Sequence, residues 1–137
     1  MGIIEPQTEK YLSALLPRRD AVLRDMERYA AKHHVPIIGP ACGRLLYQLA
    51  RLIRARRVFE MGSAIGYSAL WLARAMGPEG TVYYSDGDPA NAERARTYLR
   101  RAGMLGRVRI QVGDALHLLQ STQGLFDLVF NDVNKTQ

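Results

Sequence analysis

The chain has 137 residues, of which 47% are hydrophobic and 23% charged, so it can form one core but not two. Its net charge of +6 is carried by sixteen arginines and three lysines that are dispersed through the chain. Dispersed charges favour solvated helix faces and disfavour a nucleic-acid partner. The only cysteine, Cys42, excludes an internal disulfide and a cysteine metal cluster, and we expect an ordinary packed thiol.

No membrane partner is predicted. The opening "MGIIEPQTEK" carries charges where a signal peptide needs an apolar core. The longest uncharged run, Met61–Ala73, falls short of the roughly 18 residues that a membrane span needs. We therefore expect a soluble, cytoplasmic protein.

Residues 1–55 are predicted to form helices. The candidates are Pro6–Leu16, Arg19–His34, and a third helix with an apolar stripe of Leu45, Leu46, Leu49, Leu52 and Ile53. The segment "VPIIGP" separates the second helix from the third, because its prolines and glycine break the helical pattern.

Residues 56–137 alternate between strand and helix patterns. The predicted strands are "RVFEMG", "TVYYSD", "RVRIQVGD" and "FDLVFND", and the helices between them are "GYSALWLARAM", a segment from Asp88 to Ala102, and Asp114–Leu119. Such alternation predicts right-handed crossovers and a parallel α/β sheet. The third strand alternates apolar and polar residues and is expected at a sheet edge, whereas the fourth has no alternation and is expected to be covered on both faces.

Ligands of open parallel sheets bind at the carboxyl ends of the strands, so the residues after each strand are the candidates for a site. In "EMGSAIGYS", Gly62 and Gly66 flank a turn that a ligand can approach closely. The spacing does not match G-x-G-x-x-G, since Ala64 and Tyr67 replace two of its glycines, and no P-loop lysine follows. Asp86, twenty residues after Gly66, stands where a carboxylate can bind ribose hydroxyls.

Acidic residues follow the strands although the chain as a whole is basic. A pocket with Glu60, Asp86, Asp114 and Asp132 suits a ligand with a ribose and a positive charge but no phosphate, and S-adenosylmethionine fits this description. Each acid also has an ordinary interpretation. Glu60 could be a strand-end charge, Asp86 and Asp132 could bond their own turns, and Asp114 could cap the next helix, as Asp88 is expected to do.

Five segments together resemble the S-adenosylmethionine-dependent O-methyltransferases, in particular the metal-dependent catechol and caffeoyl-CoA O-methyltransferase group. They are "IIGPACGRLLYQLARL", "RVFEMGSAIGYSALWLA", "YYSDGDPANAERA", "VGDAL" and "FDLVFNDVNK". The resemblance implies a Rossmann-like domain whose strands supply the order 3-2-1-4 of a seven-stranded sheet. It implies methyl transfer to a hydroxyl of a small phenolic or catechol-like acceptor.

The resemblance also implies roles for individual residues. Glu60, Gly62, Ser63, Tyr67 and Ser68 would line the methionine side of the cofactor, Asp86 would hold the ribose, and Gly113, Asp114 and Ala115 would approach the adenine. Asp132 would bind a divalent cation, usually magnesium, and lie close to the cofactor. Lys135 would act as the general base or lower the pKa of the acceptor hydroxyl.

The sequence departs from the family pattern at several points. Ala41-Cys42 replace a common Glu-Gln pair before Gly43, and Asn134 replaces the second aspartate of Asp-x-Asp-Lys. The downstream Asp-Asn metal ligands and the last strands are not in the sequence. We therefore expect a fragment of one methyltransferase domain, or a fourth strand covered by another chain, for example in a homodimer. A nucleic-acid methyltransferase or binder and a non-catalytic cofactor-binding or assembly module are the alternative functions.

Overall fold

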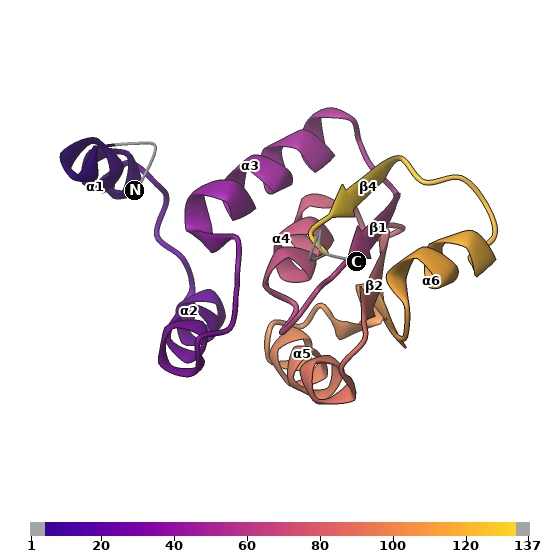
Figure 1. The fold of residues 1–137 in the computed structure, drawn as a ribbon. Coiled ribbons are helices and arrows are strands. Elements are labelled where there is room, and N and C mark those ends of the chain that lie inside the picture. The colour runs from indigo at the N-terminus through magenta and orange to yellow at the C-terminus, as the bar shows by residue number, and fades with distance from the viewer. Residues whose placement is uncertain (1–4, 134–137) are drawn as a thin grey trace.

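The computed structural model describes residues 5–133 and has a helical amino-terminal part followed by an α/β part (Figure 1). The elements are α1 (Pro6–Ala14), α2 (Ala21–His33), α3 (Gly39–Leu52), β1 (Arg57–Met61), α4 (Tyr67–Ala75), β2 (Thr81–Asp86), α5 (Pro89–Arg101), the 3-10 turn η1 (Leu105–Arg107), β3 (Val108–Val112), α6 (Ala115–Ser121) and β4 (Leu128–Asn131). The predicted helices and strands are confirmed, with bounds that differ by a few residues.

The four strands form one parallel sheet in the order β3-β2-β1-β4, as predicted. β3 lies at one edge, as predicted, but its burial does not alternate strictly, since Val108 is buried and the apolar Val112 is 45% exposed. β1 and β2 occupy the centre and are almost entirely buried. Asp127 holds the start of β4 beside β1, because its carboxylate accepts the backbone N–H groups of Arg56 and Arg57 at 2.8 and 2.9 Å.

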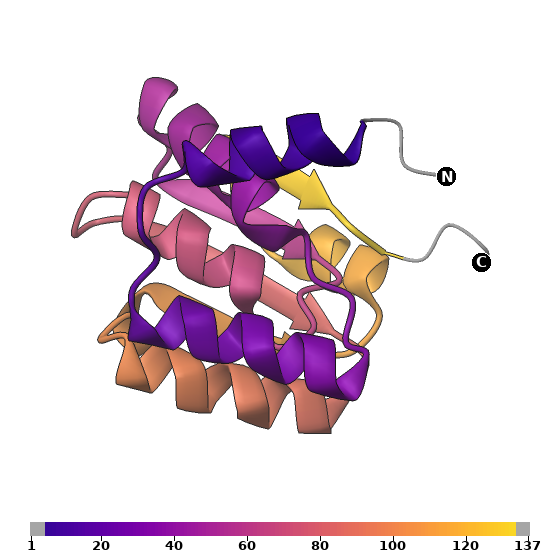
Figure 2. The ribbon, with the colours of Figure 1, turned by 90° about the vertical axis from the view of Figure 1, so that its left-hand side faces the viewer.

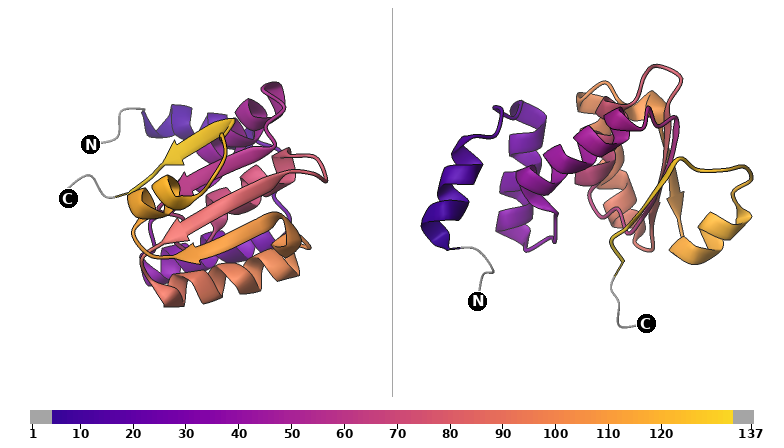
Figure 3. Two further views of the ribbon diagram at one scale, coloured as in Figure 1. Left: turned by 90° about the vertical axis from the view of Figure 1, so that its right-hand side faces the viewer. Right: turned by 90° about the horizontal axis from the view of Figure 1, so that it is seen from above.

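Helices cover both faces of the sheet (Figure 3). On one face, α2, α3, α4 and α5 enclose the main core, in which the α4 residues Leu70 and Leu72 are fully buried. Figure 2 shows α2 lying alongside α5 on this side of the molecule. On the other face, α6 covers a smaller cluster around Phe59, Met61 and Tyr83. Helix α1 has no buried residue and stands apart from the sheet in Figure 1.

Aspartates begin three of the helices. The carboxylates of Asp20, Asp88 and Asp114 accept the backbone N–H groups of Leu23, Ala90 and His117. The caps expected from Asp88 and Asp114 are therefore present, because a short carboxylate side chain can reach the unpaired N–H groups of the first turn.

The apolar stripe of α3 does not face the core as its pattern suggests. Of its members only Leu46 is buried, and the exposed members are Leu45, Leu49, Leu52 and Ile53. The buried face of α3 instead carries the small residues Gly43 and Ala50 beside Leu46. Small residues let α3 approach α4 closely, and the exposed leucines lie outside that contact.

The expectation that β4 is covered on both faces is wrong for the described residues. Leu128 and Phe130 pack against the main core, whereas Val129 is 48% exposed. The reason is that α6, which covers this face, makes its main sheet contacts with β1 and β2. Within residues 5–133, β4 has β1 as its single neighbour.

Among the described residues, no helix combines the length and the apolar character needed to cross a membrane.

Candidate functional site

The strand register brings the predicted site residues to one edge of the sheet. Met61 at the end of β1 pairs with Ser85 in β2 and with Asn131 in β4. Asp86 pairs with Val112 at the end of β3. The turn after β1 therefore lies at the centre of this edge, with the ends of β2 and β4 on either side.

Gly62 allows two backbone segments to approach one another. Its φ is +78°, and a Cβ atom there would lie 2.8 Å from the carbonyl oxygen of Asp132. Asp132 is held in this place by its own N–H, which donates to the Met61 carbonyl at 2.9 Å. A side chain at position 62 would thus collide with the backbone that carries the predicted metal ligand.

Strand β2 holds the rest of the turn. The Ser85 carbonyl accepts the N–H groups of Gly62 and Ser63, and the Asp86 carboxylate accepts the Ala64 N–H at 2.8 Å. The Tyr84 hydroxyl donates to the Ala64 carbonyl at 2.6 Å. These bonds keep Ala64 at a φ of +43°, which is costly for a residue with a Cβ atom.

Glu60 is completely buried, and neither oxygen of its carboxylate has a hydrogen-bond partner among the described residues. Burial raises its pKa from 4.5 to about 7. The nearby hydroxyls of Ser68 and Ser63 oppose this rise, and the charges of Asp132 and Asp86 add to it. Because Glu60 is buried, it is not the strand-end charge that was the alternative. An unpaired buried carboxylate favours a cationic or hydrogen-donating ligand.

Asp86 and Asp132 complete an acidic group around the turn. Besides Ala64, the Asp86 carboxylate accepts the Asp88 N–H at 2.9 Å and the Asn91 side-chain amide at 3.2 Å. The turn-bonding alternative for Asp86 is therefore present, although a carboxylate can accept about four hydrogen bonds and one position remains. Asp132 is exposed as a residue, yet the packing around its carboxylate raises its pKa above the ordinary value.

The β3 side of the edge carries the residues that the resemblance assigns to the adenine. Gly113 has a φ of +152°, and its N–H donates to the Asp86 carbonyl at 2.9 Å. Asp114 caps α6 with one oxygen, through a 2.7 Å bond from the His117 N–H. Ala115 is partly buried and packs against the smaller core. These three residues thus form the start of α6 next to Asp86.

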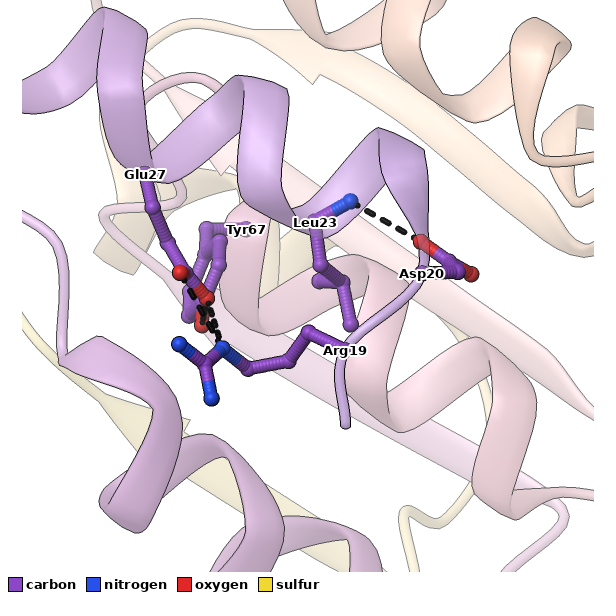
Figure 4. Close-up of polar contacts among 5 residues, drawn as sticks. All are labelled: Arg19, Asp20, Leu23, Glu27 and Tyr67. Carbon is purple, nitrogen blue, oxygen red and sulfur yellow. Dashed lines mark hydrogen bonds and ion pairs between the residues drawn. The ribbon is translucent and has the colours of Figure 1, made fainter. Parts of the chain in front are cut away.

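Tyr67 is buried, and its hydroxyl is turned toward α2, where it donates to Glu27 at 2.7 Å (Figure 4). Its backbone and the neighbouring Ser68 remain at the turn. The sequence gives no signal for Glu27, which is forty residues away and has the spacing of a solvated helix position. The sequence prediction also did not include Ser85, whose carbonyl holds the turn. The signal available was a serine near the end of the strand segment "VYYSD".

Lys135 lies outside the described residues, so its predicted role as a base stays a prediction. Within residues 5–133, no group of three histidine, cysteine, aspartate or glutamate side chains is arranged to hold a metal ion. Asp132 supplies a single carboxylate toward a cation that usually takes six oxygen ligands. The described residues alone therefore do not make a magnesium site.

Two shallow hollows lie away from this edge. One follows α5 and includes Arg94 and Arg101, and the other lies between the end of α3 and the turn before β2. Neither contains a residue of the acidic group. The chemistry is therefore gathered on the open edge of the sheet and not in the hollows.

The residues around the turn fit S-adenosylmethionine. An unpaired buried carboxylate and two adjacent acids suit its positive charge. A parallel sheet of this order, with a glycine turn after its first strand and an acid after its second, defines a Rossmann-like α/β domain.

Comparison with known proteins identifies the family of the chain. The sequence model of a family described as O-methyltransferase matches residues 13–137. A catechol O-methyltransferase of Mycobacterium tuberculosis is 39% identical over 133 residues, which are 95% of this chain and 60% of that protein. A caffeoyl-CoA O-methyltransferase of Eucalyptus globulus is 28% identical over 130 residues, 90% of this chain and 53% of that protein.

Solved structures share the fold. A methyltransferase from Geobacter sulfurreducens superposes with a TM-score of 0.87 at 35% identity, covering 93% of this chain and 67% of that one. An O-methyltransferase of Streptomyces achromogenes involved in tomaymycin synthesis, solved with S-adenosylmethionine, has a TM-score of 0.85 at 36% identity over 94% of this chain and 60% of that one. The chain belongs to the O-methyltransferase family and spans about 60% of the length of the first curated relatives it matches.

Proposed function

We propose that the chain binds S-adenosylmethionine at the carboxyl edge of its sheet, and that the protein methylates a hydroxyl of a small phenolic or catechol-like acceptor. The observation that carries the proposal is the fully buried, unpaired carboxylate of Glu60 beside the glycine turn of an O-methyltransferase family member. The names of the relatives, which are catechol and caffeoyl-CoA O-methyltransferases, support the acceptor class.

The acids would serve the positive charge of the donor. S-adenosylmethionine supplies a methyl group on a sulfonium, which a nucleophilic oxygen can attack. Glu60 would pair with the sulfonium or with the amino group of the donor. Ser63 and Ser68 would orient its carboxylate. Burial makes this interaction stronger than it would be in water.

The residues on either side of Glu60 would orient the donor. Asp86 would accept a ribose hydroxyl with its remaining lone pair while it continues to hold Ala64. Gly113, Asp114 and Ala115 would border the adenine. Fixing the donor in this way contributes to rate by positioning the methyl group for attack.

Asp132 and Lys135 would serve the acceptor. Asp132 would be one ligand of a divalent cation that also binds the acceptor, and Lys135 would help to remove the acceptor proton. Because the described residues supply one carboxylate, the remaining ligands would have to come from water, the acceptor or residues outside 5–133. A homodimer is likewise a prediction, which light scattering of the purified protein would test.

Calorimetric titration of the chain with S-adenosylmethionine and with S-adenosylhomocysteine tests the cofactor assignment. The two ligands differ by a methyl group and a positive charge, so an acidic site should bind the sulfonium form at least as tightly as the neutral form. The substitution Glu60→Gln should weaken S-adenosylmethionine the more of the two, by about tenfold. Absence of binding by a folded wild-type sample would overturn the proposal for this chain.

Metal removal is a separate test. If a cation at Asp132 serves the acceptor and not the donor, EDTA should leave the affinity for S-adenosylmethionine nearly unchanged while it abolishes methyl transfer by a full-length family protein that carries these residues. Added magnesium should restore the transfer. Turnover that persists in EDTA, or that survives Asp132→Ala, would remove the metal from the proposal.

A further inference from the structure

We infer that Glu27 of α2 is a positioning residue for the glycine turn, acting through Tyr67, and that Arg19 in turn fixes Glu27. The inference rests on the proposed function, since the turn it positions is the proposed donor site. It assigns the amino-terminal helix α2 a part in ligand binding although α2 contributes no residue to the edge of the sheet.

The three side chains form one chain of hydrogen bonds (Figure 4). The Tyr67 hydroxyl donates to Glu27 Oε1 at 2.7 Å. Arg19 Nε lies 2.8 Å from the same oxygen and 3.1 Å from Oε2 of the Glu27 carboxylate. The side chains of Arg19 and Glu27 are only 27% and 19% exposed, so solvent screens their interaction less than that of a surface pair.

The position of Tyr67 makes this contact relevant to the turn. Tyr67 is the first residue of α4 and directly follows Gly66, whose φ of +84° ends the turn. The next residue, Ser68, is one of the two serines whose hydroxyls favour the charged form of Glu60. A displacement of Tyr67 would therefore shift Ser68 and the start of α4 relative to the buried carboxylate.

Tyr67 is held on its other side by aromatic rings. Its ring meets the edge of Trp71 at 6.5 Å, and Trp71 meets Tyr47 of α3 at 6.3 Å. Burial and the neighbouring Glu27 both raise the pKa of Tyr67, which therefore stays a hydrogen-bond donor at neutral pH. The hydroxyl thus links Glu27 of α2 to a row of edge-to-face rings that runs from α4 to α3.

Helix α2 also offers a matched control. Asp25 lies two residues before Glu27 and pairs with Arg28 and with Arg101 of α5. It links α2 to α5, whereas the hydrogen bond that the Tyr67 hydroxyl donates goes to Glu27. Asp25→Asn should therefore disturb the packing of α2 without moving the turn.

The test compares donor affinity, thermal unfolding and hydrogen exchange in the whole chain. Glu27→Leu, which removes the acceptor, should weaken S-adenosylmethionine about tenfold, and Glu27→Gln, which keeps an acceptor oxygen, should restore most of that loss. Arg19→Met, which leaves the Tyr67 bond in place, should weaken it about two- to threefold. Asp25→Asn should bind as the wild type does.

Exchange of backbone amides separates this inference from the proposed function. The Ala64 and Gly66 N–H groups are hydrogen-bonded in the turn, so in the absence of any ligand they should exchange faster in Glu27→Leu than in Asp25→Asn. If the wild type fails to bind the donor, the proposed function fails and this exchange still decides the inference. Wild-type donor affinity in Glu27→Leu, or unchanged exchange at Ala64 and Gly66, would overturn it. If Glu27→Leu does not fold, Arg19→Met and Glu27→Gln are compared with Asp25→Asn instead. Wild-type donor affinity and wild-type amide exchange in Arg19→Met would then overturn the inference.

Discussion

Glu60 is the one acid among the described residues that is buried. It lies in a central strand, where its carboxylate is removed from water and has no hydrogen-bond partner of ordinary geometry among the described residues. The Ser63 and Ser68 hydroxyls favour its charged form but do not offset the burial. Its pKa is about 7 in the folded chain and near 4.5 when the chain is unfolded. The folded state therefore holds one more proton than the unfolded state between these two values. Since stability falls with pH wherever the folded state binds more protons, Glu60 makes the fold less stable as pH rises from about 4.5 to 7.

Glu60→Gln should remove this contribution. We expect the wild type to lose on the order of 3 kcal/mol of unfolding free energy from this one group between pH 4.5 and pH 7, with no further loss above it. The variant should lack this loss and be the more stable of the two at pH 8. Urea unfolding of both proteins at pH 5 and pH 8 measures the difference, in which other titrating groups cancel. An identical pH dependence in both would contradict the assignment.

Gly62→Ala should destabilise the chain by about 1–3 kcal/mol, because alanine at a φ of +78° is strained and its Cβ would meet the Asp132 carbonyl. Gly77→Ala is the control, since a Cβ atom there would meet nothing within 4 Å. Chemical denaturation gives both values. If the two variants are equally stable, the close approach of the two backbones at Gly62 is not a constraint on the fold.

At the scale of single residues, the sequence was sufficient where the chemistry is local. The caps at Asp88 and Asp114 follow from an aspartate before a helix, and both are present. The complete burial of Glu60 and the orientation of Tyr67 toward Glu27 could not be predicted. They depend on strand pairing and on a contact forty residues apart, which leave no periodic pattern in the sequence.

At the scale of elements, α3 and α4 approach each other closely at Gly43. A Cβ atom on Gly43 would overlap the indole ring of Trp71. The same indole ring makes an edge-to-face contact with the ring of Tyr67. The position of α4, and with it the start of the turn, therefore depends on a residue of α3 that has no side chain.

Gly43→Ala should force α3 and α4 apart and destabilise the fold by about 1–3 kcal/mol, as overpacking of a well-packed contact does. Trp71 is the single tryptophan of the chain, so its fluorescence should shift in the folded variant. Gly106→Ala, with open space around the position, should leave both the melting temperature and the emission as in the wild type. A variant Gly43→Ala with wild-type emission would mean that the helices do not meet there as described.

The order of elements was readable from the sequence, but the direction in which some of them face was not. Strand-helix alternation predicts the parallel sheet and the edge position of β3, and both are confirmed. The leucines of α3 and the apolar run of β4 look like core in isolation. Which face of each is buried depends on neighbours, namely Trp71 for α3 and the position of α6 for β4.

On the scale of the whole molecule, the positive charge is spread out and partly neutralised. Arg19, Arg74 and Arg101 pair with acids of α2 or its cap, and Arg57 donates to Tyr83 and to the Gln123 carbonyl. Several arginines thus serve the packing of the described residues. A continuous phosphate-binding surface would need them to face solvent together.

We therefore expect weak binding to duplex DNA or RNA with a shallow salt dependence, corresponding to few phosphate contacts. Fluorescence anisotropy with a labelled duplex, between about 50 and about 200 mM salt, measures how steeply the affinity falls with salt concentration. A steep decline of affinity with salt, as six or more contacts would give, would favour the nucleic-acid alternative over a small-molecule acceptor.

The turn after β1 is built largely by a strand that comes after it. Tyr84, Ser85 and Asp86 of β2 supply the bonds that hold residues 62–64, and the turn itself contains a strained alanine. During folding the turn cannot mature on its own, because its partners are brought to it only by the crossover through α4. The turn and the centre of the sheet should consequently form and melt as one cooperative unit, so a substitution that loosens β2 should also lower the affinity of the turn for the proposed donor.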